Sequence, residues 1–193
     1  CDWMYETQHS DGKRKGKINY TVWSDVFSCP ECAGEVIFWN VAVDQDGGQV
    51  RDEFTCPHCS ADLSKRNMER AWTTKYDSAI NKTVTQAKQV PVLINYSVNG
   101  KRFEKSPDAH DLGLIEKIEL TDIPHYFPTN AIGIGDKTGE PLRIGLTHVH
   151  HLFTRRNLAV FSALYARTRS PVTRLALLGE YTVGFKTARF LPL

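Results

Sequence analysis

Two Cys-x-x-Cys pairs constrain the fold of this chain more than any other feature of its sequence. The first pair reads Cys29-Pro30-Glu31-Cys32, the second reads Cys56-Pro57-His58-Cys59, and twenty-three residues separate them. A two-residue gap lets one tight turn direct two sulfur atoms at one ion, and two such turns complete a tetrahedron of thiolates. All four ligand positions are then filled by protein, so the sequence predicts a closed, structural zinc site at Cys29, Cys32, Cys56 and Cys59.

Three other interpretations of the cysteines stay open at this point. Two disulfides would need a secretory context, and the chain does not open on a basic and then apolar run. A redox Cys-x-x-Cys motif is not expected twice across a hairpin. His58, inside the second pair, is an alternative fourth ligand. Free thiols beside zinc-binding turns favour a reducing, cytoplasmic location.

The segment between the pairs favours a zinc ribbon. Residues 35–43 are rich in β-branched and aromatic side chains, which predicts a strand. Residues 44–48 predict a turn, and residues 49–55 predict a second strand that pairs with the first and delivers Cys56. Upstream, strand-like residues 3–7 and 18–23 flank the basic turn 11–17, which predicts a β-hairpin with a cationic tip.

The remainder of the chain predicts further antiparallel strands and then helices. Asn99-Gly100 is a strong hairpin signal. Thr154 is an expected helix N-cap, and Ser106 is another, with Pro107 at the first helical position. The predicted elements are a helix at 65–72, strands at 73–76, 89–98 and 101–105, a helix from 107 to Leu120, an irregular connector at 121–147, and helices at 155–167 and 171–178.

These elements together predict an α+β fold: a zinc ribbon plus small antiparallel β elements, followed by a helical C-terminal part. The predicted domains are 1–76, a β-hairpin and zinc-ribbon module, and 77–193, an α+β part ending in two helices. The first residues, Cys1-Asp2-Trp3, and the apolar ending indicate a piece excised from a longer protein. No stretch approaches eighteen consecutive apolar residues, so no membrane span is expected.

The charge of the chain is more informative in its distribution than in its total. The net charge of +2 is too small to indicate nucleic-acid binding by itself. From Arg143 onward, however, Glu180 is the only acid among many basic residues. A basic face of this kind fits a polyanionic partner. It equally fits a solvated helix face, or a surface that docks on another domain.

Two motifs that invite catalytic interpretations do not carry them far. After Thr147-His148-Val149-His150-His151, Asn157 follows too closely for a His-Asn-His nuclease and no histidine occurs after His151, so a polar lead-in to the Thr154 helix is favoured. Ile132-Gly133-Ile134-Gly135 has no third glycine in a strand–helix unit, so it is a weak phosphate loop. No residue is predicted to be catalytic or to bind an organic cofactor.

Three stretches of the chain resemble the middle region of large bacterial site-specific DNA methyltransferases of the N6-adenine/N4-cytosine class. They are residues 16–32, residues 90–96 and residues 147–158. The glycine-rich S-adenosylmethionine loop and the Asp-Pro-Pro-Tyr/Phe motif of that family are not present in this sequence. The resemblance therefore implies a zinc-containing, DNA-binding target-recognition insert of a restriction-modification methylase. S-adenosylmethionine would then be held elsewhere in the parent enzyme, and the base would be flipped into a pocket elsewhere.

The expected partners are DNA and the remaining methyltransferase domain. The predicted DNA-binding residues are Lys13, Arg14, Lys15, Lys65, Arg66, Arg155 and Arg156. The two arginines at 155 and 156 fall in the first turn of a helix, where cations are unfavourable, which suggests an outside partner such as phosphate. The alternative is an ion pair with acids of the remaining domain. For the whole chain, the alternative function is a non-enzymatic structural zinc scaffold or protein-interaction module.

Overall fold

The computed structural model of the chain describes residues 1–44, 47–135 and 138–168. Its elements in chain order are η1 (Asp2–Tyr5), β1 (Glu6–Gln8), β2 (Lys15–Ser28), β3 (Glu35–Ile37), α1 (Phe38–Ala42), β4 (Glu53–Thr55), β5 (Asp62–Ser64), β6 (Glu69–Arg70), β7 (Trp72–Asp77), β8 (Lys82–Ala87), β9 (Gln89–Val98), β10 (Lys101–Lys105), α2 (Ala109–Glu119), α3 (Gly139–Arg143), η2 (Val149–Leu152) and α4 (Arg155–Arg167). The fold is mixed α+β with antiparallel strand pairs, and its longer helices follow the strands, as predicted.

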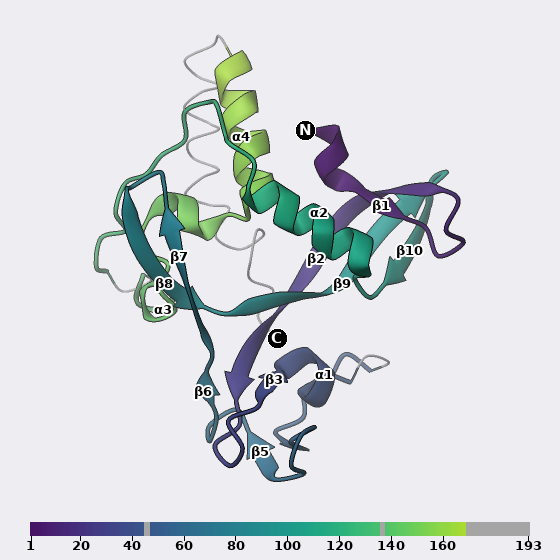
Figure 1. The fold of residues 1–193 in the computed structure, drawn as a ribbon, viewed down its shortest axis with the longest axis vertical. Coiled ribbons are helices and arrows are strands. Elements are labelled where there is room, and N and C mark those ends of the chain that lie inside the picture. Colours follow the sequence, from purple (N-terminus) through teal and green to yellow (C-terminus); the bar gives the residue numbers. More distant parts are fainter. Residues whose placement is uncertain (45–46, 136–137, 169–193) are drawn as a thin grey trace. The chain divides into compact units, whose positions relative to one another are not determined.

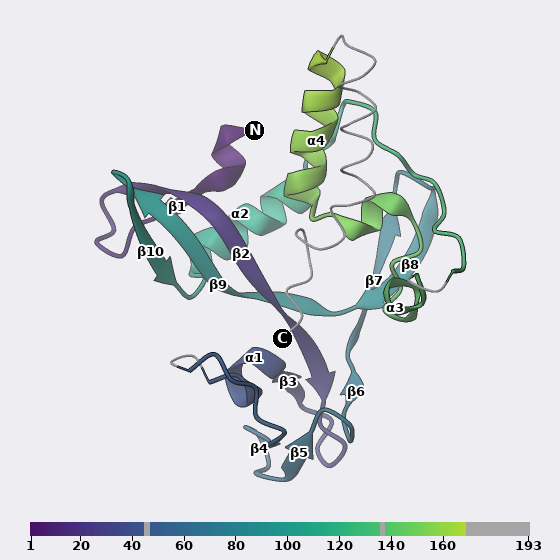
Figure 2. The same cartoon turned by 180° about the vertical axis from the view of Figure 1, so that it is seen from behind.

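Three sheets organise the strands (Figure 1 and Figure 2). The largest follows the path β1-β2-β9-β10, and β3 and β6 also pair with β2. The hairpins β4–β5 and β7–β8 are separate two-stranded sheets. The predicted strands at 73–76, 89–98 and 101–105 are confirmed as β7, β9 and β10.

The chain forms two compact units, and each is described by itself. Among the described residues, those from 21 to 94 form one unit, and those of 1–20 and 95–168 form the other. The long strands β2 and β9 each contribute residues to both units. This division differs in position from the boundary at residue 76 that the sequence suggests.

The unit of residues 21–94 has a small apolar core of its own. Its buried residues are Phe27, Cys29, Val36, Phe38, Ala42, Phe54, Cys56, Leu63 and Met68. The three aromatic rings form one packed group, with Phe38 lying 5.7 Å from Phe27 and 5.8 Å from Phe54 between ring centroids. Two of the four predicted zinc ligands therefore belong to the core itself.

The strand predicted at residues 35–43 is wrong beyond Ile37. The backbone N–H of Trp39 donates to Ser24 Oγ at 2.9 Å, and α1 begins at Phe38. Phe38 and Ala42, four residues apart, are both buried on the same side of this short helix. Core burial thus outweighs the β propensity of the segment.

The strand pairing and one helix predicted around the second cysteine pair also need correction. β3 pairs with β2, and β4 pairs with β5, so the two predicted ribbon strands are not each other's partners. Between residues 43 and 53, Val43 and Val50 form an isolated bridge in place of a continuous strand. The predicted helix at 65–72 is wrong, because this segment holds a turn, β6 and the start of β7. The hairpin strand β8 was not predicted.

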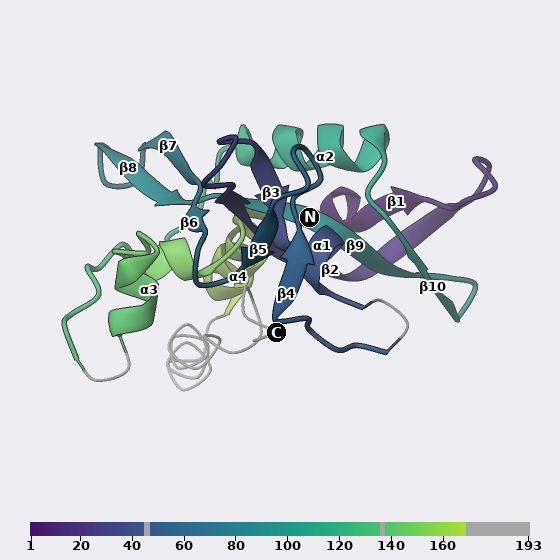
Figure 3. The same cartoon turned by 90° about the horizontal axis from the view of Figure 1, so that it is seen from below.

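In the other unit, α2 covers one face of the sheet formed by β1, β2, β9 and β10 (Figure 3). Thr7 Oγ1 donates to Asp111 Oδ1 at 2.6 Å, which links β1 to the buried side of α2. The Lys105 ammonium lies 2.8 Å from Asp111 and 2.7 Å from Asp108, and it also donates to the Gln8 carbonyl at 2.9 Å. The buried Asp111 carboxylate is therefore paired and hydrogen-bonded, as a buried charge must be.

Helix α2 begins later than predicted. Its N-cap is Asp108, whose side chain accepts from the Asp111 N–H, while Asp111 accepts from the Asp108 N–H. This reciprocal capping box replaces the predicted Ser106 cap. The predicted Thr154 cap of α4 is confirmed, because Thr154 accepts from the Asn157 N–H.

The remaining helical predictions have mixed outcomes. A 3–4 spacing of apolar residues in 155–167 predicts a buried stripe at Leu158, Phe161, Leu164 and Tyr165. In α4 the buried positions are Leu158, Ala159 and Ser162, whereas Leu164 is exposed, so this stripe is only partly right. The connector 121–147 contains α3 in addition to irregular structure. The predicted helix at 171–178 lies outside the described residues. Within the described residues, no helix is long and apolar enough to cross a membrane.

We expect Asp108→Ala to destabilise the chain by about 1 kcal/mol, because the capping box is lost. Burial opposes ionisation of Asp108, but the Lys105 ammonium and the Asp111 N–H outweigh it and lower the pKa of Asp108 to about 2. A carboxylate with a lowered pKa stabilises the fold above its unfolded pKa of about 3.9 and loses that effect as the pH falls toward 2. Denaturant unfolding measures the free energy of unfolding of the unmodified chain and of Asp108→Ala, and the difference between the two values should therefore become smaller as the pH is lowered. The control is Ser106→Ala, and a larger effect there would contradict the assigned cap.

Candidate metal centre

The two cysteine pairs lie in two turns with the same backbone hydrogen bonds. The first turn joins β2 to β3, and the second joins β4 to β5. In the first, the Cys29 N–H donates to the Gly34 carbonyl and the Ala33 N–H donates to the Cys29 carbonyl. In the second, Cys56, Ala61 and Ser60 repeat this pattern, at 2.8 and 3.0 Å.

Each turn needs a left-handed residue just after its second cysteine. Ala33 has φ of 57° and Ser60 has φ of 60°, a conformation that costs free energy for residues with a Cβ atom. The residues are equivalent in position, so both turns adopt one strained geometry. That geometry directs two sulfur atoms of each turn to the same side.

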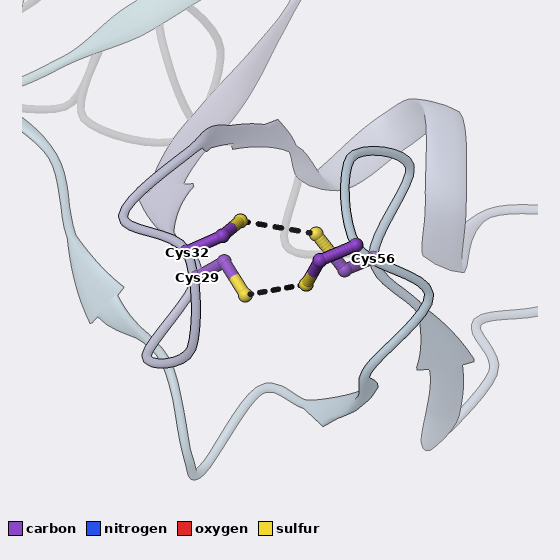
Figure 4. A group of neighbouring side chains, drawn as sticks. Cys29, Cys32 and Cys56 are labelled. Atoms are coloured by element: carbon purple, nitrogen blue, oxygen red, sulfur yellow. Dashed lines mark hydrogen bonds between the residues drawn. The ribbon is translucent and has the colours of Figure 1, made fainter.

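The sulfur atoms of the two turns face one another (Figure 4). Cys29 Sγ lies 3.8 Å from Cys59 Sγ, and Cys32 Sγ lies 3.8 Å from Cys56 Sγ. All four sulfur atoms lie within 4.8 Å of one another. A zinc tetrahedron with Zn–S bonds of about 2.3 Å has S···S edges of about 3.8 Å. A disulfide requires about 2.05 Å, and all five cysteines are free thiols.

The four thiols differ in burial and acidity. Cys29 and Cys56 are buried, whereas Cys32 and Cys59 are exposed. Burial opposes ionisation of Cys56, but the backbone N–H groups of His58 and Cys59 and the neighbouring thiols lower its pKa to about 6. The Ala61 N–H favours the Cys59 thiolate, yet desolvation of the sulfur within the cluster and the other three thiols raise its pKa to about 12. The cluster therefore shares protons that a bound cation would displace.

His58 is not among the clustered ligands, and it holds the two turns together instead. Its Nε2 lies 2.9 Å from the Glu35 carbonyl oxygen, so the ring of the second turn reaches across to the first. A Cβ atom added to Gly34 would lie 2.6 Å from His58 Cδ2 and 3.2 Å from Cys32 Sγ. Glycine at position 34 is thus required for this close approach.

A cluster of two aspartates and a histidine also resembles a metal site, but the ammonium group of a lysine already occupies the position between the carboxylates. Asp108, His110 and Asp111 bring possible ligand atoms within 4.8 Å of one another. The Lys105 ammonium contacts both carboxylates, at 2.7 and 2.8 Å. The cluster is therefore a satisfied ion pair within the unit.

The predicted DNA-binding residues of the first hairpin lie at its exposed tip. Asp11 accepts from the Lys13 and Arg14 N–H groups at 2.9 and 3.1 Å and pairs with Arg14 Nε at 2.6 Å. These bonds hold the pKa of the Asp11 carboxyl well below its usual range. Lys15 pairs with Glu6 at 2.7 Å, and the Lys13 side chain is exposed. The tip is a turn of fixed geometry that presents cations to solvent.

Lys65 and Arg66 lie in the turn that follows β5. The Lys65 ammonium lies over the Phe38 ring, 5.0 Å from its centroid. The Arg66 side chain is exposed. The helix predicted at 65–72, which would have placed both residues on one basic side, does not form here.

Arg155 and Arg156 have partners within the chain. Arg155 donates from Nε and Nη2 to the Thr121 carbonyl, at 3.2 and 2.9 Å. The Arg156 guanidinium lies over the Tyr5 ring, 5.3 Å from its centroid, and burial lowers its pKa. These contacts explain why two arginines occupy the first turn of α4 without an external ligand. Their DNA contact stays a prediction.

The His-rich motif forms η2, immediately before α4. His150 and His151 are buried, and the Thr147 N–H donates to His151 Nδ1 at 3.2 Å. This placement agrees with a polar lead-in to the Thr154 helix.

A scan of protein families, curated proteins and solved structures finds no match to this chain.

We expect Cys29→Ser to remove bound zinc and locally unfold residues 21–94, because structural zinc contributes folding free energy. Zinc binds thiolates and displaces their protons, so its stabilising effect is present at neutral pH and falls as protons compete for the four sulfur atoms on acidification. Elemental analysis measures the zinc content of the Cys29→Ser variant, and a colorimetric titration measures the release of zinc as the pH is lowered. Protein purified without chelator that contained no zinc would contradict the assignment.

Gly34→Ala should weaken zinc binding and lower the free energy of unfolding, since the new methyl group displaces the His58 ring. The matched control is Gly113→Ala in α2, where an added Cβ meets nothing within 4 Å. That control should be neutral or stabilising by roughly 0.5–1 kcal/mol. Thermal unfolding with and without zinc compares them, and equal zinc affinity in both variants would show that the contact is dispensable.

Proposed function

We propose that this chain is a zinc-stabilised DNA-binding module, the target-recognition insert of an S-adenosylmethionine-dependent N6-adenine or N4-cytosine DNA methyltransferase. The observation that carries DNA binding is the exposed basic tip of the first hairpin, where Asp11 fixes the backbone that presents Lys13 and Arg14. A pre-organised cationic turn loses little conformational entropy when it meets a phosphate. The resemblance of the sequence to this methyltransferase class supports the more specific assignment.

The zinc ion in this proposal is structural, and the module has the form of a zinc ribbon. Cys29, Cys32, Cys56 and Cys59 would hold it, and four protein ligands leave no position for a substrate or water. When bound, the ion supplies cross-linking of two turns and no reaction chemistry. S-adenosylmethionine and the target base would be held by the remaining domain of the parent enzyme.

A second candidate function is a zinc scaffold that organises a parent protein without touching DNA. This function is favoured by the contacts that Arg155 and Arg156 make within the chain. Because of these contacts, two of the predicted DNA-binding residues are engaged by the protein itself. The two functions differ in one measurable property. Phosphate contacts make DNA affinity fall steeply with salt concentration, whereas a scaffold gives no such dependence.

The test is binding of the zinc-loaded chain to a fluorescent DNA duplex across a salt series. Lys13→Ala should weaken binding to every duplex sequence and reduce the salt slope by about one unit, because one phosphate contact is lost. The charge-matched control is Arg51→Ala, which removes an exposed cation from the other unit. Salt-independent or undetectable binding by the unmodified chain would favour the scaffold.

A further inference from the structure

A second turn lies at the same end of the sheet as the basic tip. Asn99 and Gly100, with φ of 50° and 78°, form the two-residue turn between β9 and β10, and Lys101 and Arg102 follow. Strands β2 and β9 approach tightly there, since a Cβ atom on Gly16 would lie 2.4 Å from the Tyr96 ring and 3.2 Å from Val98. The turns belong to the same compact unit (Figure 3).

The sheet face opposite α2 is polar at this end. Thr7 and Gly16 are paired in register, and Thr7 points at Asp111 of α2, so Lys15 and Lys17 point away from that helix. On this outward face Asn19 donates to Ser97 Oγ at 2.9 Å and to Asn95 Oδ1 at 2.8 Å. A face whose side chains hydrogen-bond to one another is pre-organised for a hydrated, polar partner rather than an apolar one.

The acids near this surface are already engaged, whereas four cations are not. Asp11 is bonded to Arg14, Glu6 to Lys15, and Glu104 accepts from Asn95 at 2.9 Å. At this end of the sheet, four described cations have exposed side chains and no hydrogen-bond or ion-pair partner: Lys13, Lys17, Lys101 and Arg102. The surface therefore offers net positive charge to a polyanion.

We propose that the β9–β10 hairpin enters the major groove of a DNA duplex, where Arg102 contacts a base edge, while Lys13 of the neighbouring turn contacts phosphate. The inference rests on the proposed function and specifies its DNA surface. Paired strands lie about 4.8 Å apart, so a two-stranded hairpin fits a groove about 12 Å wide. The neighbouring hairpin then lies at the flanking backbone.

The chemistry assigns different roles to these cations. Arg102 lies on the same outward face of β10 as Glu104. Its exposed guanidinium forms no hydrogen bond or ion pair with the residues that the structure describes, so it can pair with guanine O6 and N7. Lys13 sits at the tip, where a point charge meets phosphate without reading sequence. Lys17 lies on the outward face and adds a phosphate contact, whereas Lys101 alternates with Arg102 along β10 and lies on its other face.

The experiment selects preferred duplexes from a randomised pool with the zinc-loaded chain, and then compares variants on the preferred and a scrambled duplex. Arg102→Ala should lose roughly 5- to 150-fold in affinity for the preferred duplex and much less for the scrambled one, with relaxed preference at one base pair. Arg102→Lys should keep the salt slope but not the base preference. Lys13→Ala should weaken both duplexes equally.

The outcomes separate this inference from the function on which it rests. If the unmodified chain binds no duplex with salt-dependent affinity, the proposed function fails and this inference fails with it. If the chain binds DNA, but Arg102→Ala behaves like Arg51→Ala or weakens both duplexes equally, DNA binding stands and the reading role of the β9–β10 hairpin is overturned. Preference for single-stranded over duplex DNA would also overturn it.

Discussion

The convergence of four thiols on one point is the constraint on which the structure of residues 21–94 depends. The buried core of this unit is small, and Cys29 and Cys56 are members of it. Small cores supply little net stability, so units of this size need a disulfide or a metal to hold them. Sulfur distances of 3.8 Å fit a tetrahedral ion and exclude disulfides. In the proposed zinc-bound form, ligation offsets the strain of the turns at Ala33 and Ser60.

The other unit is held together by a different interaction. Asp111 is buried on α2, and it is bonded to Thr7 of β1 and to Lys105 at the end of β10. A buried carboxylate that lost these partners would be strongly destabilising, so the sheet and the helix depend on each other. The opposite face of the sheet does not contact α2 and has no part in pairing the Asp111 carboxylate. Polar and basic residues can therefore occupy it.

Cations in this chain divide into those that support the fold and those that face solvent. Arg155 and Arg156 bond to a carbonyl and lie over an aromatic ring, which are contacts of a structural kind. Lys13, Lys17, Lys101 and Arg102 instead lie at one end of a sheet whose acids are already bonded. Net charge alone does not make this distinction, because it counts both groups equally. The placement of the charges, and not their number, supports a polyanionic partner.

The sequence by itself determined the features that depend on a few neighbouring residues. The Cys-x-x-Cys spacing, the Asn99-Gly100 turn and the Thr154 cap are local, because each is fixed by backbone geometry within one turn. Only the tertiary structure decided which strands pair, why Phe38 starts a helix, and which partner Arg156 finds in Tyr5. Those outcomes depend on burial and on contacts between distant segments. Likewise, the pairing of β2 with β9 brings the β9–β10 hairpin into one sheet with the first hairpin, although sixty residues separate the end of β2 from the start of β9.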